Sequence, residues 1–188
     1  MSMTGKPLAI EGFREAVAMD VAIWAKQHGV PARLYFVLRH LVLCPGFHFV
    51  FWHRVVRLLR RIPLAGGILS RIMLFWLEIG FSSQISLSAR IGGGLYTPHP
   101  FGIVIGMGSK IGKNVTIHQH VTLGSRSAQK REQPSIEDDA YVGAGAVLLG
   151  PITIGQAAKI GANAVVLNDV PAGCVAVGNP AKVTVPSQ

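Results

Sequence analysis

His99 is the first residue whose chemistry stands out, because it lies between two prolines at a break in a regular pattern. Aliphatic residues recur every six positions, yet from Ile91 to the next full repeat at Ile105 the spacing is fourteen residues instead of twelve. The two extra residues fall around Pro98-His99-Pro100, and a bulge of this kind pushes a side chain out of a regular wall, often beside an active site. An imidazole titrates near neutral pH and can accept the proton of a hydroxyl. His99 is therefore our candidate general base.

His118 and His120 are the rivals of His99. On the six-residue pattern, His120 precedes the inward Val121, so we expect it to point outward. The three histidines could bind a metal ion, but no Asp or Glu lies nearby in sequence to complete such a site. We therefore predict no metal.

A second break in the pattern runs from Ser125 to Ser135 and carries Arg126, Lys130 and Arg131. A polar loop that projects from a rigid scaffold is a common place for binding groups. The sequence has no Walker loop, and Gly92-Gly93-Gly94 begins no helix, which argues against a dinucleotide fingerprint.

The elements that must position these residues follow from the six-residue repeat. Its aliphatic positions are Ile85, Ile91, Ile105, Ile111, Ile117, Leu123, Ile136, Val142, Leu148, Ile154, Ile160 and Val166. Small or β-branched residues stand four places after most of them, as at Ala89, Val115, Ala140 and Ala158. A repeat of six is typical of a parallel β-helix, in which about three repeats complete a coil and the coils stack about 4.8 Å apart. A β-sandwich with fortuitous spacing is the alternative.

The first half of the chain has a helical pattern. We predict helices over residues 10–28, 32–43, 47–61 and 64–81, and we divide the chain into a helical region, 1–84, and a β-helix domain, 85–188. The helix 47–61 carries His53, Arg54, Arg57, Arg60 and Arg61 among apolar residues. It is either a membrane-surface helix facing acidic headgroups or a core helix whose basic edge is solvated or buried in an oligomer.

Composition limits the partners and the compartment. The 188 residues carry a net charge of +9, which favours an anionic partner such as a phosphorylated ligand or an anionic membrane surface. Nucleic acid is disfavoured, because the C-terminal half lacks interleaved arginines and aromatic residues. The two distant cysteines, the absence of a long apolar run and the charged residues near the N-terminus favour the cytoplasm, with the inner face of the membrane as an option.

Residues 85–183 resemble the hexapeptide acyltransferases, and more narrowly the serine acetyltransferase group and its relatives that O-acetylate polysaccharide precursors. The matching segments are Ala89 to Leu95, Thr97 to Ile105, Val121 to Gly124, Val142 to Ala146, Lys159 to Ala162 and Val177 to Lys182. The resemblance implies a mainly β fold, a left-handed parallel β-helix preceded by an α-helical segment.

The resemblance also implies a mechanism and its partners. It places the catalytic histidine on His99, with acetyl-CoA as donor, direct transfer without an acyl-enzyme, and a homotrimer or dimer of trimers whose sites lie between neighbouring β-helices. Three small residues would line the pantetheine arm and two lysines would meet the phosphates: Ser125, Ala144, Ala162, Lys159 and Lys182.

Four residues depart from the serine acetyltransferase pattern. The aspartate that orients the catalytic imidazole is replaced by Gln84, and the aspartate before the histidine by Pro98. The Arg-His pair that holds the amino acid's carboxylate aligns with Glu132-Gln133. A buried charge without a partner is costly, so an amino-acid acceptor is expected to bind poorly. Gln84 could still hold His99 through a neutral hydrogen bond.

We therefore expect an acetyl-CoA-dependent O-acetyltransferase that acts on a hydroxyl of a sugar or polysaccharide precursor. The first alternative is a serine O-acetyltransferase of cysteine biosynthesis. The second is a non-catalytic β-helical scaffold.

Overall fold

The structure is a computed structural model that describes residues 12–127 and 129–185. Its helices are α1 (Phe13–Gln27), α2 (Leu34–Leu43), α3 (Pro45–Leu59) and α4 (Gly66–Phe81). The first two residues of the predicted helix 10–28 lie outside the described range, and α1 begins at Phe13. We predicted that Pro45-Gly46 would separate the helices 32–43 and 47–61. Instead, α3 begins at Pro45. Proline suits the first turn of a helix, because the N–H that it lacks would have no partner there.

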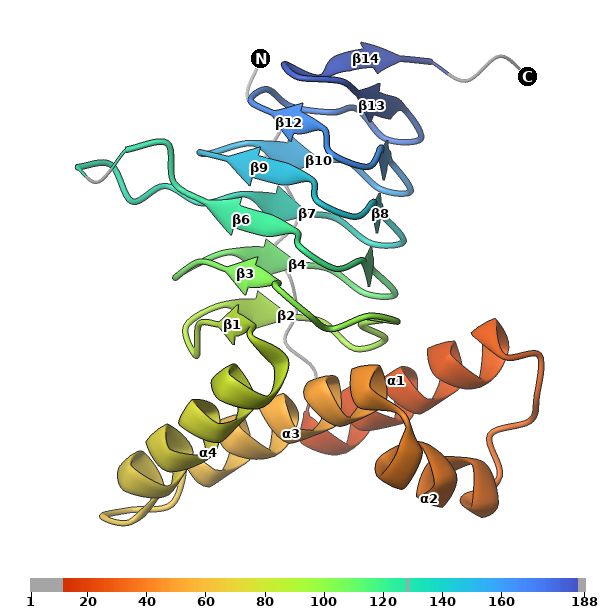
Figure 1. Cartoon of the computed structure of the whole chain (residues 1–188), viewed down its shortest axis with the longest axis vertical. Coiled ribbons are helices and arrows are strands. Elements are labelled where there is room, and N and C mark those ends of the chain that lie inside the picture. Colours follow the sequence, from red (N-terminus) through yellow and green to blue (C-terminus); the bar gives the residue numbers. More distant parts are fainter. Residues whose placement is uncertain (1–11, 128, 186–188) are drawn as a thin grey trace.

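The second part of the chain consists of short strands that wind into a parallel β-helix (Figure 1). The strands are β1 (Gln84–Ile85), β2 (Arg90–Ile91), β3 (Val104–Ile105), β4 (Lys110–Ile111), β5 (Thr116–Ile117), β6 (Thr122–Gly124), β7 (Ser135–Ile136), β8 (Tyr141–Val142), β9 (Val147–Leu149), β10 (Thr153–Ile154), β11 (Lys159–Ile160), β12 (Val165–Val166), β13 (Val175–Val177) and β14 (Lys182–Thr184). The predicted fold class, mainly β with a left-handed parallel β-helix after a helical segment, is confirmed.

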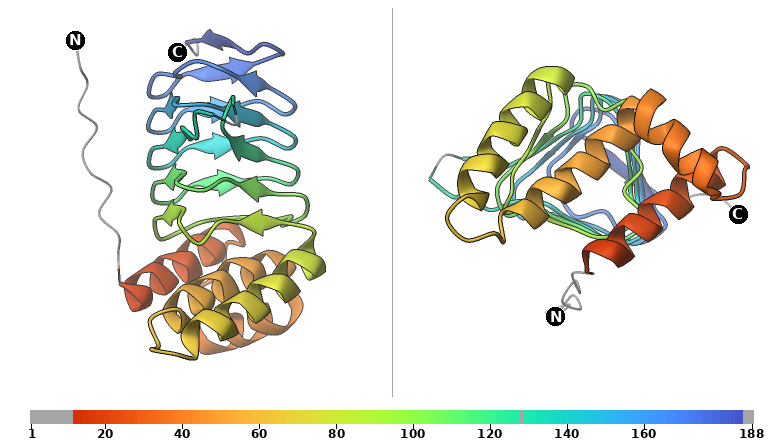
Figure 2. Two further views of the ribbon diagram at one scale, coloured as in Figure 1. Left: turned by 90° about the vertical axis from the view of Figure 1, so that its left-hand side faces the viewer. Right: turned by 90° about the horizontal axis from the view of Figure 1, so that it is seen from below.

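Three sheets form the walls of the β-helix. Sheet A has the order β1-β3-β6-β9-β12, sheet B the order β10-β7-β4-β2, and sheet C the order β14-β13-β11-β8-β5. The strand pairs are parallel except β13 with β14. A triangular prism results, and it is visible end-on in Figure 2.

The register of the strands stacks the repeated aliphatic residues in columns inside the prism. In sheet A, Ile105 lies beside Leu123, and Leu123 beside Leu148. These side chains are fully buried. The second pair is in register although the loop between β6 and β7 lengthens that coil. The repeat therefore fixes the core, and the loop projects from it without disturbing it (Figure 1).

The helices lie across one open end of the prism (Figure 2). Phe49 and Val50 of α3 join the same buried core as the aliphatic columns, and Phe81 packs against it. Helix α4 ends at Phe81 and β1 starts at Gln84, so the chain passes directly from helix to coil. The division into separate domains at residue 84 stays a prediction.

The basic helix predicted over 47–61 has two buried basic side chains, His53 and Arg54, whereas Arg57 is half-buried and Arg60 and Arg61 are exposed. His53 and Arg54 are 4% and 6% exposed, so these two side chains belong to the core and do not face a membrane. In the described residues no single helix has the length and apolarity to cross a membrane, and α2 with α3 meets that criterion only as a pair bent by 95°.

Candidate active site

His99 is exposed on a turn that leads from sheet C to sheet A. Tyr96, just before this turn, bridges to Thr116 of β5, and Val104, just after it, lies in β3. The same edge of the prism carries the turns 118–121, 143–146 and 161–164 in the following coils. We call this row of turns the histidine edge.

Two buried contacts fix the turn that carries His99. On one side Thr97 lies against Gly46 at the start of α3, where a Cβ in place of the glycine hydrogen would overlap the Thr97 carbonyl oxygen. On the other side the Ser83 hydroxyl donates to the Pro100 carbonyl at 2.8 Å and accepts from the Ile103 N–H at 2.9 Å. The bulge predicted from the broken repeat is thus braced from both ends. The repeat marked the bulge, but nothing in the sequence pointed to Ser83.

His118 is the closest histidine neighbour of His99, with ring centroids 6.4 Å apart. It is half-buried and also contacts Tyr141, at 5.1 Å between centroids. Burial, and then the charge of His99, lower the pKa of His118, whereas a hydrogen bond with Gln119 raises it. The lowered pKa favours the neutral form of His118.

His120 has a different role in the turn. Its backbone φ is 59°, its N–H donates to the Phe101 carbonyl at 2.9 Å, and its exposed ring packs on Gly102. It therefore points outward, as expected, and forms the corner.

Gln84 lies in β1 with its side chain exposed, and its N–H donates to the Ile103 carbonyl at 2.8 Å. Within residues 12–127 and 129–185, no hydrogen bond joins its side chain to His99. The pairing of Gln84 with the imidazole stays a prediction.

The small residues predicted to line the donor follow His99 along the histidine edge. Ala144 and Ala162 occupy equivalent places in successive turns, where the Asn163 N–H donates to the Ala144 carbonyl at 2.8 Å. Over the described part of the chain, the N–H groups of Ala144 and Ala162 themselves have no protein partner. Lys159 and Lys182 are both exposed on sheet C, two strands apart. The edge thus offers free backbone donors beside two cations.

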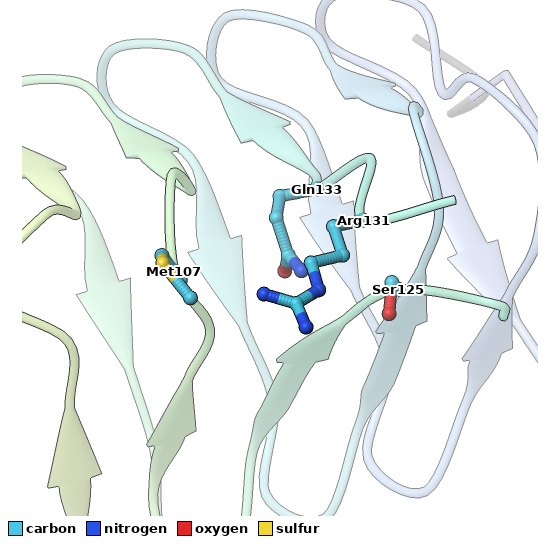
Figure 3. A pocket seen from close by; sticks show the side chains of 4 residues that line it. All are labelled: Met107, Ser125, Arg131 and Gln133. Carbon is cyan, nitrogen blue, oxygen red and sulfur yellow. The ribbon is translucent and has the colours of Figure 1, made fainter. Parts of the chain in front are cut away.

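Ser125 lies elsewhere, on the turns that lead from sheet A to sheet B. We call this row, formed by residues 106–109, 125–127, 129–134 and 150–152, the loop edge. A cavity of about 510 Å³ opens there, lined by Met107, Ser125, Arg131 and Gln133. Figure 3 shows the Arg131 guanidinium pointing into it, between Met107 and Ser125.

Arg131 lines this cavity, and the motif pattern gave no expectation of a cation there. Glu132-Gln133 stand in place of an Arg-His pair, and Arg131 immediately precedes them. Gln133 folds back over Gly106 and its amide oxygen accepts from the Ser109 hydroxyl at 3.4 Å. The sequence predicted a basic loop here, but it could not predict which of its side chains points into a cavity.

His99 and Arg131 are not brought together within one chain, because they lie at opposite ends of the strands of sheet A. The histidine edge holds the imidazole and the free backbone donors, and the loop edge holds the guanidinium. Among the described residues, no three His, Cys, Asp or Glu side chains converge in a way that could hold a metal ion.

Known proteins resemble the chain at both levels, sequence and structure. Residues 133–168 match the bacterial transferase hexapeptide (six repeats) family. The serine acetyltransferase of Bacillus licheniformis is 42% identical over 144 residues, which cover 74% of this chain and 64% of that protein. The serine acetyltransferase of Helicobacter pylori is 42% identical over 145 residues, which cover 76% of this chain and 82% of that protein.

Among solved structures, soybean serine acetyltransferase complexed with serine superposes with a TM-score of 0.79. It is 37% identical, and the match covers 92% of this chain and 69% of that one. The chain thus spans about two thirds of the B. licheniformis and soybean proteins. Because these relatives are serine acetyltransferases, the expectation of a sugar or polysaccharide acceptor is wrong, and the departures at Gln84, Pro98 and Glu132-Gln133 did not justify it.

Proposed function

We propose that this chain, which belongs to the serine acetyltransferase family, transfers the acetyl group of acetyl-CoA to the hydroxyl of L-serine. The observation that carries the proposal is the likeness to the serine-bound soybean enzyme over 92% of the chain. The exposed His99 on a braced turn and the cationic cavity at Arg131 supply the two functions that such a reaction needs, a base and a carboxylate site.

The reaction begins when His99 accepts the proton of the serine hydroxyl. The resulting alkoxide attacks the thioester carbonyl carbon and forms a tetrahedral intermediate. When the intermediate collapses, the C–S bond breaks, and the departing thiolate of CoA takes the proton back from the imidazolium. The products are O-acetyl-L-serine and CoA, and His99 returns to its neutral state.

Arg131 binds the serine carboxylate in this account. A guanidinium forms two parallel hydrogen bonds with a carboxylate, which fixes the orientation of the amino acid as well as its position. The neighbouring Gln133 and Ser125 add neutral polar groups to the same cavity. Arg131, which immediately precedes Glu132-Gln133, therefore takes the place of the missing Arg-His pair in binding the carboxylate.

Acetyl-CoA lies along the histidine edge. The free N–H groups of Ala144 and Ala162 can donate to the amide carbonyls of the pantetheine arm, and the small side chains leave room for the arm. Lys159 and Lys182 then meet the phosphates through charge-assisted hydrogen bonds. Ser125, on the other edge, approaches the donor only from a neighbouring subunit.

The separation of His99 from Arg131 calls for an oligomer. In a closed ring of identical subunits, the histidine edge of one copy faces the loop edge of the next, and every interface is equivalent. A homotrimer is the smallest such assembly for a three-sided prism. A dimer of trimers contains the same interface.

An acceptor comparison tests the proposal. Purified protein with acetyl-CoA is given L-serine, D-serine or serinol, which lacks the carboxylate, and the free thiol released is followed over time. We expect rapid turnover with L-serine and at least tenfold lower kcat/KM with serinol, because the Arg131 contact is lost. Equal turnover of serinol and L-serine, or no turnover of either, would contradict the proposal.

A further inference from the structure

A second cavity of about 240 Å³ lies between α1, α3 and the first coil of the β-helix. Four arginines line it, Arg54, Arg57, Arg60 and Arg61, together with apolar side chains that include Phe13 and Leu87. Arg54 and Arg57 lie in α3, Arg60 is its C-cap and Arg61 follows it; the last two side chains are exposed. The reaction proposed above uses none of these residues.

The positive charge of this cavity, which we call the arginine pocket, is only partly balanced by the described residues. Asp20 is its nearest acid and is already engaged, because it bonds Arg54 through both oxygens and also accepts the N–H groups of Gly94 and Leu95. Among the described residues, no ion pair involves Arg57, Arg60 or Arg61.

The effect of the surrounding positive charge is clearest in the pKa of Arg57. Arg57 is half-buried, and within the described part of the chain the hydrogen bond it donates goes to the Ala89 carbonyl, at 3.0 Å. Burial, and then repulsion from Arg54 and Arg61, lower the pKa of its guanidinium. Like charges gathered in a partly buried cavity destabilise the fold unless an anion neutralises them.

We propose that the arginine pocket binds a phosphate-bearing ligand. Guanidinium groups match phosphate oxygens with two parallel hydrogen bonds, and several of them around one cavity favour a group with more than one negative charge. The apolar wall suits an organic part attached to the phosphate. The same chemistry is found in a soluble phosphorylated metabolite and in a phospholipid headgroup.

This pocket is distinct from the site proposed for the phosphates of CoA. It lies at the helical end of the molecule, whereas Lys182 lies in β14 at the opposite end (Figure 1). Binding at the two sites can therefore be separated by saturating one of them.

The experiment uses pyrophosphate as the probe and the full-length protein saturated with CoA. Binding is measured by calorimetry for the wild type, for Arg60→Gln/Arg61→Gln and for Arg71→Gln, an exposed arginine on α4 that serves as the matched control. We expect the wild type and the control to bind equally, and the double variant at least tenfold more weakly. Arg60 and Arg61 stand at the end of α3, so their loss should leave the fold intact, which the thermal unfolding midpoint checks.

Vesicles of phosphatidate in phosphatidylcholine distinguish the two sources of the phosphate. Sedimentation of the wild type but not of the double variant, reversed by pyrophosphate, would identify a lipid headgroup. Pyrophosphate binding without sedimentation would identify a soluble ligand. The proposal is overturned if pyrophosphate does not bind at about 10 mM, or if the double variant and the wild type bind equally. Serine turnover should be the same in all three proteins, so failure here leaves the proposed function unaffected.

Discussion

Arg54 and Asp20 form a buried ion pair that joins α3 to α1 and ties both helices to the β-helix. The Arg54 Nε lies 3.0 Å from Asp20 Oδ2, and the two side chains are 6% and 4% exposed. The remaining Arg54 nitrogens donate to the carbonyls of Ile91 and Gly92, at 2.8 and 2.6 Å. Helices and first coil therefore share one polar network.

Asp20→Asn should strongly destabilise the protein. The substitution leaves the Arg54 charge buried without its partner, which typically costs about 3–5 kcal/mol in the free energy of unfolding. Urea denaturation measures the change. Glu15→Gln, an exposed acid on the same helix, serves as the control and should shift stability by about 0.5 kcal/mol or less. Similar losses of unfolding free energy in both variants would show that the Asp20–Arg54 ion pair stabilises the fold no more than an exposed carboxylate does.

Stability should fall in mild acid because of His53. Burial, followed by the charges of Arg54 and Arg57, lowers the pKa of His53 from 6.5 to about 3. As the pH falls below 6.5, the unfolded chain takes up a proton that the folded chain does not, so stability is lost progressively towards pH 3.

His53→Leu should remove this part of the acid sensitivity. Between pH 7 and 5 the unfolding free energy of the wild type should fall more steeply than that of the variant, by about 1 kcal/mol per pH unit. His118, whose pKa is also lowered, contributes in the same direction and remains in both proteins. Parallel pH profiles would mean that the pKa of His53 is the same in the folded and unfolded chains, which would contradict this prediction.

Arg131→Gln should raise KM for L-serine by about 10- to 100-fold, because a charged hydrogen-bonding partner of the carboxylate is lost. KM for acetyl-CoA should change little, since the donor lies on the histidine edge. Lys130→Gln, an exposed cation of the same loop, is the matched control and should behave like the wild type. An unchanged KM for serine in Arg131→Gln would remove Arg131 from the site.

Mixing two impaired variants, assayed at an L-serine concentration near the wild-type KM, tests whether the site forms between subunits. His99→Ala and Arg131→Gln are unfolded and refolded together, so that their chains share trimers. An interface that pairs His99 of one copy with Arg131 of the next is then intact in roughly a quarter of cases, and activity should recover to about that fraction. Recovery no greater than the sum of the separate variants would place both residues in one chain's own site.

The six-residue repeat was sufficient to predict the β-helix, because its inward aliphatic positions follow directly from the pitch of the coil. The break at Pro98-His99-Pro100 likewise located the exposed histidine. Both features are local in sequence. They can therefore be predicted without knowing which residues pack against them.

Contacts between distant segments were not predictable in the same way. Asp20 and Arg54 are 34 residues apart, and neither stands out among the charges of its helix. Arg54 and His53 were grouped with a basic helical face, yet the helix turns them inward because it covers the open end of the prism. The acceptor was misjudged for a related reason: the sequence lacks the motif pair, but the position of Arg131, which we propose takes its place, is visible only in three dimensions.

The rate of L-serine acetylation by His99→Ala tests the central claim most directly. The variant should bind acetyl-CoA as the wild type does, because the donor contacts lie in later coils, while kcat falls by about 10²–10⁴-fold through loss of the general base. His120→Asn, which keeps a residue that tolerates the left-handed corner, should retain most of its activity. If His99→Ala turns over L-serine at the wild-type rate, or if the wild-type protein forms no O-acetyl-L-serine, the account is contradicted.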